Sequence, residues 1–512
     1  MNADNQPHEP WWNCEPAPRS RKGGAGNPPP TVCEEGGFPT AELLEGRGAA
    51  KENTHQLATD RTQSRAFVSN GLLRVREVAR KDKDARFTAL LHHLTTDLLC
   101  RSFYSLKRQA SAGVDRVTWR QYEEGLVSNL ERLCEQVHRG TYRALPSRRV
   151  YIPKSDGRQR PLGVAAMEDK IVQHATVTIR NQIYEEDVLG FSYGFRLGRS
   201  QHDALDALCV GLSKPVSWVL DADIQGFFDN LNHEWLLRFI EHRVADRRIV
   251  RLIRKWLRAG VLEDGRRIRT EKGTPQGVVV SPLLANIYLH YVLDVWVQKW
   301  RQTQADGYVM IVRYADDFVM GFQYHRDARR FLTDLRERMS TFGLVLHPEK
   351  TRLIEFGRFA AGSRRAKGQG KPETFDFLGF THYCSRRKNG EGFVVRRKSI
   401  RKRAVETLKT IREQLHRHRH RSIVQQGQWL AAVLRGYFNY HAVPGNIETL
   451  KMFRRECARV WLHALRRRSQ RHRMDWNRMA RLVERYFPPA RTLHPLPNVR
   501  FYANIQGRSR MR

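Results

Sequence analysis

The chain has 512 residues and carries 90 Lys and Arg against 53 Asp and Glu, which gives a formal net charge of +37. A charge of this size favours a polyanionic partner, and nucleic acid is the expected one, bound with a strong dependence on salt. The sequence has no apolar run long enough to cross a bilayer and no basic and apolar leader at its start, so neither a membrane partner nor secretion is expected.

The seven cysteines are scattered without a CxxC pair, which argues against a disulfide framework or a zinc module and fits a reducing compartment. Residues 1–65 are rich in Gly, Pro, Glu and Arg, and we expect them to form a disordered extension. Residues 66–146 are predicted to be helical, because one apolar stripe at helical spacing contains Phe87, Leu90, Leu91, Leu94 and Leu98.

A hairpin is predicted next, with strands around 148–154 and 159–163 joined by a turn at 155–158. Lys154 and Arg160 lie on opposite arms of this hairpin, where two cations would repel each other. A triphosphate held between them would remove the repulsion. A solvated basic turn explains the same residues equally well.

Residues 216–224 contain the first pair of acids. Trp218, Leu220 and Ala222 alternate with Asp221 and Asp223, so that the two acids share one face of a strand whose other face is apolar. This pattern favours a metal-binding role over a structural one.

A second pair of acids lies at 314–317, in the sequence Tyr-Ala-Asp-Asp, between the apolar runs 309–312 and 318–320. Apolar flanks around a polar tip predict a β-hairpin. Two adjacent carboxylates repel each other, and a divalent cation with a preference for oxygen ligands, such as Mg²⁺, removes that cost. Taken by itself, the pair could equally be a solvated turn.

The C-terminal part, from about 398, is predicted to be helical and strongly basic, and its cationic faces are candidate surfaces for nucleic-acid phosphates. Before it, a tight Gly-Thr-Pro-Gln-Gly loop at 273–277 leads into a helix that begins with Ser-Pro at 281–282.

The order of the motifs is more specific than any one of them. The chain contains, in this order, Tyr-Ile-Pro-Lys, Arg-Pro-Leu, Ser-Tyr-Gly-Phe-Arg, Asp-x-Asp-Ile-x-Gly-Phe-Phe-Asp, Gly-Thr-Pro-Gln-Gly, Ser-Pro-Leu-Leu-Ala-Asn, Tyr-Ala-Asp-Asp, Glu-Lys-Thr and Phe-Leu-Gly-Phe. From about 113 to 475 it closely resembles the reverse transcriptase/maturase proteins encoded by bacterial group II introns.

The resemblance implies an α+β right-hand polymerase with fingers, a palm built on an antiparallel sheet, and an α-helical thumb or maturase domain. The expected segments are a disordered extension (1–65), a helical N-terminal extension of the fingers (66–146), reverse transcriptase fingers and palm (147–385), the thumb or maturase domain X (386–475) and a basic C-terminal segment (476–512).

The implied function is that of an RNA-directed DNA polymerase, which adds dNTPs to a DNA primer on an RNA template. It would also bind its group II intron RNA, promote splicing and retrohome into target DNA, in the bacterial cytoplasm. Two Mg²⁺ ions, which Mn²⁺ can replace, would be held by Asp223, Asp316 and Asp317. Adjacent strand residues point to opposite sides, so Asp317 ranks below the other two, and Asp221 is a weaker candidate.

Other roles follow from the resemblance by position. Lys154 and Arg160 would clamp the incoming triphosphate, and Phe228 would exclude a 2′-hydroxyl. Gln276 would contact the nucleotide, Arg196 a phosphate, and Lys350 the departing pyrophosphate as a catalytic group. The residues expected to bind RNA in the thumb are Arg435, Tyr437, Tyr440, Arg454 and Arg455.

One feature departs from the family pattern. The last cysteine is Cys457 and no later metal-ligand cluster follows, so an endonuclease domain is not expected and the primer would come from another source, such as a replication fork. Two other functions compete with the first: a non-enzymatic RNA-binding splicing cofactor, and a reverse transcriptase of a retron or defence lineage. The Leu-Arg-Gly-Tyr-Phe-Asn-Tyr segment at 434–440 favours an intron maturase.

Overall fold

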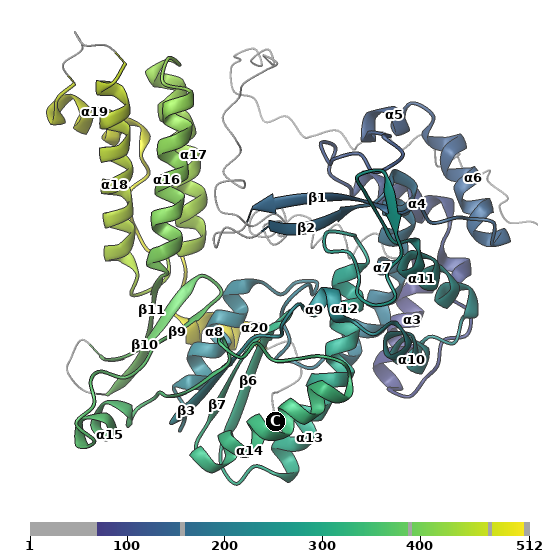
Figure 1. The fold of residues 1–512 in the computed structure, drawn as a ribbon, viewed down its shortest axis with the longest axis horizontal. Helices are drawn as coiled ribbons and strands as arrows, with labels where there is room; N and C mark the ends of the chain where they lie inside the picture. Colours follow the sequence, from purple (N-terminus) through teal and green to yellow (C-terminus); the bar gives the residue numbers. More distant parts are fainter. Residues whose placement is uncertain (1–68, 154–158, 388–391, 469–473, 506–512) are drawn as a thin grey trace, which may run out of the picture.

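The computed structural model describes residues 69–153, 159–387, 392–468 and 474–505. The expected 1–65 extension, Lys154 and residues 506–512 lie outside the described residues. Helices and an antiparallel sheet are combined in one chain, which confirms the α+β class (Figure 1). Within the described ranges, no helix is both long and apolar enough to cross a membrane.

The N-terminal part is helical, as predicted, with α3 (Asn70–Lys81), η2 (Leu91–His93), α4 (Thr96–Tyr104), α5 (Trp119–Glu123) and α6 (Leu126–Arg139). The prediction of one helical stripe over 87–98 was wrong. The carboxylate of Asp246 accepts hydrogen bonds from the backbone N–H groups of Leu90 (2.8 Å) and Leu91 (2.9 Å), which fixes this stretch outside a regular α-helix. Helix α4 then begins where the Thr95 side chain caps its first turn.

The predicted basic hairpin is present as β1 (Ser147–Pro153) and β2 (Gln159–Val164), which pair antiparallel. Strand β1 also pairs with β4 (Val261–Glu263), and β4 with β5 (Arg266–Ile268). The helices α7 (Met167–Asp187), α10 (His233–Arg243) and α11 (Arg247–Ala259) lie in the same part of the molecule, on the side away from α16–α18 (Figure 1).

A second sheet has the order β6-β7-β3-β8, with all neighbours antiparallel. Its strands are β3 (Trp218–Ala222), β6 (Val309–Tyr314), β7 (Asp317–Phe322) and β8 (Arg352–Glu355). Both faces are covered, because Leu220 and Met320 belong to one buried cluster and Val219 and Val319 to another. The polar face predicted around Asp221 is therefore confined to the end of β3.

The helices around this sheet are α8 (Gln201–Leu212), α9 (Phe227–Asn230), α12 (Ser281–Leu289), η3 (His290–Asp294), α13 (Val295–Thr303), α14 (His325–Thr341) and α15 (Ala360–Ala366). Helix α12 begins at the predicted Ser-Pro pair, with proline in its first turn, but the prediction of Ser281 as the N-cap was wrong: Val280 is the N-cap residue, and the Ser281 hydroxyl donates to the Pro275 carbonyl instead (2.9 Å). Segment η3 is a π-helical turn between α12 and α13, an irregularity that often marks a functional region.

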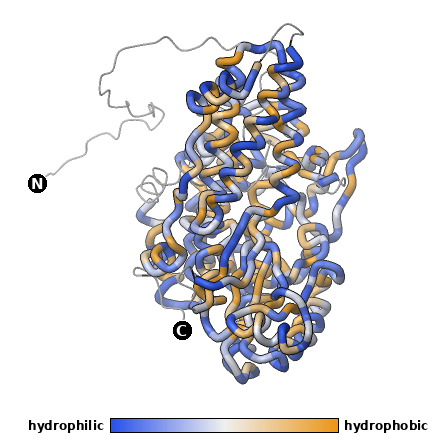
Figure 2. The backbone as a smooth tube through the Cα atoms, turned by 90° about the vertical axis from the view of Figure 1, so that its left-hand side faces the viewer, coloured by the Kyte–Doolittle hydropathy of each residue, from blue (hydrophilic) through white to orange (hydrophobic). Residues whose placement is uncertain are grey.

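The C-terminal part follows a three-stranded sheet of β9 (Phe375–Phe377), β10 (Phe380–Arg386) and β11 (Phe393–Ser399). Its helices are α16 (Arg401–Arg417), α17 (Ile423–His441), α18 (Ile447–Arg466), α19 (Trp476–Tyr486) and α20 (Pro497–Ile505). Polar and apolar residues alternate along them (Figure 2), as expected for helices with one buried face. Met479 and Phe487 share the core of α16–α18, so this packing unit extends beyond residue 475, and α20 returns to α8.

Candidate active site

The Tyr-Ala-Asp-Asp sequence forms the turn between β6 and β7. Tyr314 pairs with Asp317, which leaves Ala315 and Asp316 at the tip. Ala315 has φ +58°, a left-handed conformation that a residue with a Cβ rarely adopts. The turn is backed by Gly194 of the Ser-Tyr-Gly-Phe-Arg motif, where an added Cβ would lie 2.2 Å from the backbone nitrogen of Ala315. Only glycine allows this approach.

Strand register brings the two pairs of acids together. Ala222, the last residue of β3, pairs with Phe318 of β7; Asp223 follows Ala222 and Asp317 precedes Phe318, so the two acids lie at the same end of this strand pair. Directly opposed residues of antiparallel strands share a face. The register therefore gives no reason to rank Asp317 below Asp316, as the alternation of side chains along one strand had suggested.

Charge is concentrated at this end of the sheet. Desolvation by the surrounding protein, followed by the charges of Asp316, Asp223 and Asp221, raises the pKa of Asp317 to about 7. Burial and then the charge of Asp223 raise the pKa of Asp316, and Arg160 on β2 partly offsets the rise. Arg160 is thus within electrostatic reach of the acids, as the predicted triphosphate clamp requires.

Two cations are paired with the acids at the end of β3, Asp221 within the strand and Asp223 just after it. The ammonium of Lys350 lies 2.5 Å from Asp223 Oδ2, and a guanidinium nitrogen of Arg352 lies 3.3 Å from Asp221 Oδ2. Burial raises the pKa of Asp221 to about 6 even though Arg352 opposes the shift. Lys350 therefore sits beside a candidate metal ligand, on the segment that follows the bridge between Ile224 and Leu346.

The donor set fits a divalent cation in its chemistry. Carboxylate oxygens are the ligands that Mg²⁺ prefers, and the pKa values of Asp316 and Asp317 are raised first by desolvation and then by the charges of neighbouring acids, a repulsion that a cation would relieve. Among the described residues, no three His, Cys, Asp or Glu side chains are already gathered tightly enough to hold a metal ion. At Asp223 the ammonium of Lys350 donates a hydrogen bond to the carboxylate and supplies a positive charge beside it.

Phe228 and Gln276 lie on segments that meet beside β2. The half-buried Phe228 is on α9, and its carbonyl accepts a hydrogen bond from the Thr274 N–H (2.8 Å). Gln276 is two residues further along this loop, and its carbonyl accepts from Gly163 of β2 (2.6 Å). The structure thus brings together Phe228, the Gly-Thr-Pro-Gln-Gly loop and the basic hairpin.

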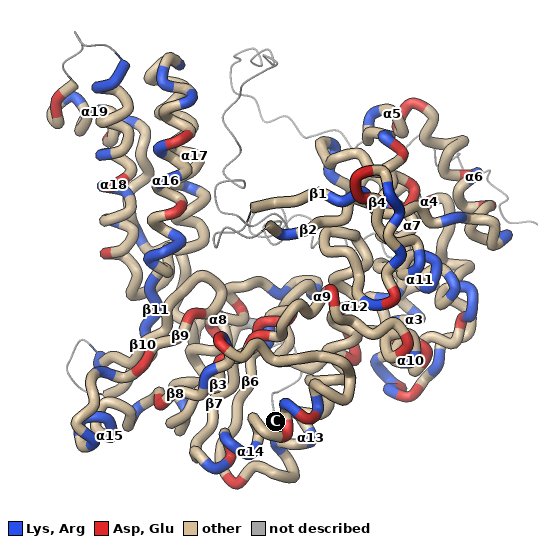
Figure 3. The backbone as a smooth tube through the Cα atoms, in the orientation of Figure 1, with Lys and Arg blue, Asp and Glu red and all other residues tan. Residues whose placement is uncertain are grey.

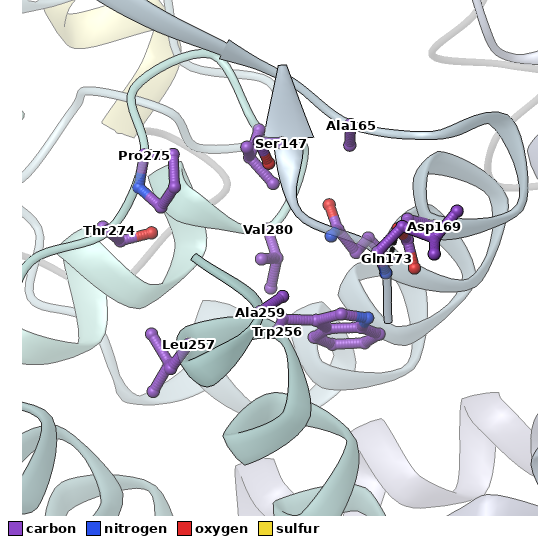
Figure 4. A pocket seen from close by; sticks show the side chains of 12 residues that line it. Ser147, Ala165, Asp169, Gln173, Trp256, Leu257, Ala259, Thr274, Pro275 and Val280 are labelled. Atoms are coloured by element: carbon purple, nitrogen blue, oxygen red, sulfur yellow. Dashed lines mark hydrogen bonds between the residues drawn. The ribbon is translucent and has the colours of Figure 1, made fainter. Parts of the chain in front are cut away.

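A small internal cavity lies behind this loop, between β1, α7 and α11 (Figure 4). Its walls include Ser147, Asp169, Gln173, Trp256 and Pro275, and its volume is about 10 Å³, too small for a nucleotide. Burial raises the pKa of Asp169 to about 6, while the Tyr142 hydroxyl donates a hydrogen bond to it and opposes the rise. This cavity is a packing gap under the loop and not a substrate site.

Arg196 was predicted to contact a phosphate, and the structure corrects this. Its buried guanidinium donates to Glu185 (3.1 Å) and to the carbonyls of Leu189 and Ser192 (both 2.9 Å). These partners occupy it within the protein. Arg196 stabilises the segment that leads to Gly194 and is not available to a nucleic acid.

Three of the five predicted RNA-binding residues also have internal roles. Tyr437 is 3 % exposed and stacks on Phe453 with the ring centres 3.8 Å apart. Tyr440 donates its hydroxyl to the Leu378 carbonyl (2.6 Å), and Arg454 donates to the Pro488 carbonyl (3.0 Å). Helical spacing from Leu430 through Val433 and Leu434 to Tyr437 would have indicated this burial. Arg435 and Arg455 are exposed, as surface contacts require.

The sequence analysis missed a buried network that supports the Tyr-Ala-Asp-Asp turn. Arg313 and Asp294 are both fully buried and form a two-pronged ion pair of 2.7 and 2.6 Å. Arg313 also donates to the carbonyl of Ala315 (2.9 Å) and to Asn286 (3.2 Å), which in turn donates to the carbonyl of Gly194 (2.7 Å). An arginine inside an apolar strand was the signal in the sequence.

Burial alone would raise the pKa of Asp294, but the charge of Arg313 holds it below its usual value. The pair is therefore ionised in the core. It connects α12, η3 and β6 to the backbone on both sides of the turn.

The sequence is similar to those of known proteins. Residues 152–382 match the family model described as reverse transcriptase (RNA-dependent DNA polymerase). The chain is 36% identical over 245 residues to protein YkfC of Escherichia coli, covering 42% of this chain and 64% of the relative. It is 35% identical over 224 residues to the group II intron-encoded protein LtrA of Lactococcus lactis, covering 43% of this chain and 37% of LtrA. The matched regions span less than two thirds of these relatives.

Proposed function

We propose that the chain is a reverse transcriptase of the group II intron-encoded type and that it copies RNA into DNA. The observation that carries the proposal is the grouping of Asp223, Asp316 and Asp317 at one end of an antiparallel sheet, with their charges acting on one another. The substrates would be dNTPs, a DNA primer and an RNA template.

Asp223, Asp316 and Asp317 would hold the catalytic ions. Mg²⁺, or Mn²⁺ in its place, would supply two-metal chemistry, which activates the primer 3′-hydroxyl and neutralises the leaving pyrophosphate. Lys350, released from Asp223, would place its ammonium near the pyrophosphate. Arg160, together with Lys154, would hold the triphosphate.

Phe228 and Gln276 would select and align the nucleotide. The Phe228 ring would lie under the sugar, where its bulk leaves no room for a 2′-hydroxyl. Gln276 is fixed to β2 through its backbone, so its side chain would contact the nucleotide and template at a set distance from Arg160. These roles rest on family resemblance together with the convergence of these segments.

Primer extension tests the proposal. Wild-type protein with Mg²⁺ should extend a DNA primer on an RNA template, and Asp316→Ala should reduce the rate at least about a thousandfold, because electrostatic groups at the reacting atoms contribute on that scale. Glu337→Ala, on an exposed position of α14, is the control and should extend normally. Extension that survives Asp316→Ala would refute the assignment of the site.

We propose in addition that the protein binds group II intron RNA and promotes its splicing and retrohoming into target DNA. The names of its relatives support this, since one is a group II intron-encoded protein and another a nuclear intron maturase of Arabidopsis thaliana. Exposed Arg435 and Arg455 on the helical part would contact the RNA. Splicing assistance without any primer extension by wild type would instead favour a non-enzymatic splicing cofactor.

A further inference from the structure

The residues after α19 cross from the C-terminal end of α17, in the helical part (α16–α19), to α8. The backbone N–H groups of Leu493 (2.9 Å) and His494 (3.2 Å) both donate to the carbonyl of Ala442, the residue that ends α17. Helix α20 follows and packs against α8. Residues 493–505, called the strap here, therefore contact both the helical part and the elements around the second sheet.

Helix α8 is fixed to the strands that border the candidate active site. Its Leu205 and Leu208 are buried in the same cluster as Val219 of β3 and Val319 of β7. Packing of this kind transmits displacement, because protein interiors are dense and have low compressibility. A side chain that anchors the strap to α8 therefore also anchors it to the sheet that carries the acids.

His494 joins the strap to α17 through its ring as well as through its backbone. Its Nε2 lies 2.7 Å from the carbonyl oxygen of Asn439, and its Nδ1 lies 2.9 Å from Nη2 of Arg500 on α20. A guanidinium group only donates, so Nδ1 accepts and the proton is on Nε2, which donates to the carbonyl. The ring is therefore neutral, and burial supports this form because it lowers the pKa of His494 to about 4.

Two side chains of the strap, those of His494 and Arg500, reach α8. The Nε of Arg500 lies 3.2 Å from Oδ2 of the fully buried Asp206, whose Oδ1 is paired with Arg397 of β11. The His494 ring stacks on the buried ring of His202, with the ring centres 3.9 Å apart. A continuous chain of contacts thus runs from α17 through these two side chains to α8.

Basic residues recur along α16–α18 and on β11 at their base (Figure 3). A nucleic-acid duplex bound by these helices and by the sheet at the same time would contact two bodies. Such a ligand dissociates more slowly when the two bodies are already fixed relative to each other, because binding then has less order to impose. The strap fixes them at a point outside the candidate active site.

On the basis of the proposed copying of RNA into DNA, we propose that the strap is a brace between the helical part and the sheet. His494 and Arg500 are positioning residues, which hold α17 at a set distance from α8 and so prolong the contact of the enzyme with the primer–template duplex. They act through α17 and α8 and not at the reacting atoms. Single additions of dNTP are therefore independent of the strap, whereas the number of additions per binding event depends on it.

Primer extension by the full-length protein, with an excess of unlabelled primer–template as a trap, measures the number of additions per binding event. His494→Ala and Arg500→Ala should each shorten the mean product about fivefold, because changes at a contact surface act mainly on dissociation. Addition of one dNTP in a single turnover should stay within about twofold of the wild-type rate, which also shows that each variant is folded. The double variant should resemble the single ones, since both residues act through one chain of contacts.

Two further variants are matched controls. Arg491→Ala removes the same charge as Arg500→Ala, from an exposed position just before the strap, and should give products of wild-type length. His494→Gln keeps one donor and one acceptor on its side-chain amide and should give longer products than His494→Ala.

The brace is overturned if both alanine variants give products of wild-type length, or if Arg491→Ala shortens the products as much as Arg500→Ala does. It is also overturned if the addition of one dNTP slows as much as the product shortens, because the effect would then lie at the active site or in folding. An absence of any extension by the wild-type protein would instead refute the polymerase function and, with it, this role of the strap.

Discussion

At the scale of single residues, the carboxyl of Asp317 has the most direct consequence. Its surroundings and its acidic neighbours raise its pKa to about 7, above the roughly 3.9 of an unfolded chain. The folded protein therefore binds this proton more tightly than the unfolded chain does. Without metal, stability should fall as pH rises from about 4 to about 7, and the cost remains at higher pH.

Asp317→Asn removes this cost, because asparagine is neutral at every pH. In EDTA at pH 8 the variant should melt above wild type by roughly 1–2 °C, since an exposed side chain is partly screened by solvent and the chain is large. At pH 4 the two should melt together. Asp84→Asn, on the exposed 82–85 turn, should show no such difference. Equal melting of Asp317→Asn and wild type at pH 8 would contradict the proposed repulsion.

At the scale of elements, the β6–β7 turn is held by side chains from outside its own hairpin. Asn286 of α12 connects Arg313 to the Gly194 carbonyl, so three segments share one polar network. Asn286→Ala should cost about 1–3 kcal/mol of stability, because buried polar partners are left unpaired. It should also lower kcat of primer extension about tenfold, with KM for dNTP changed less than about twofold, since small displacements of catalytic groups slow chemistry.

A control separates positioning from stability in this experiment. Ile411→Val, in the core of the helical part, should lose about 1 kcal/mol without a change in kcat. If both variants retain wild-type kcat below their melting temperatures, the network is structural only.

At the scale of the whole molecule, the C-terminal helix connects the helical part to the sheet. The carboxylate of the fully buried Asp206 of α8 forms ion pairs with two guanidinium groups. The nitrogen of Arg397 of β11 lies 2.6 Å from Oδ1, and that of Arg500 of α20 lies 3.2 Å from Oδ2. His494 stacks on His202 beside them, with ring centres 3.9 Å apart. Three parts of the chain, each more than 100 residues from the next, therefore meet at one carboxylate.

Asp206→Ala should destabilise the protein by about 3–5 kcal/mol, because it leaves Arg397 buried without its partner. Arg500→Ala should cost only about 1 kcal/mol, since its guanidinium is partly exposed, but should speed hydrogen exchange in α20 and α8. Thermal melts and hydrogen exchange measure the two effects. Unchanged exchange in α8 and α20 would show that Arg500 does not hold them together.

Local sequence patterns were sufficient to predict several strands, hairpins and candidate site residues of this protein. Period-two alternation predicted β3 with Asp221 and Asp223, and apolar flanks predicted the hairpin around Asp316, because the face and tip of a strand are local properties. The basic hairpin and the Ser-Pro start of α12 were predicted for the same reason. The sequence thereby determined which residues could form the site.

Only the tertiary structure decided which of those residues meet and which are already engaged. The pairing of β3 with β7 brings Asp317 and Asp223 to the same end of the sheet, where their charges interact, and no pattern within either strand contains that proximity. Burial turned Arg196, Tyr437 and Arg454 into internal contacts, while the same chemistry remains exposed at Arg435 and Arg455. Long-range packing therefore decides whether a side chain of a given type is exposed to a ligand or forms its ion pairs and hydrogen bonds within the fold.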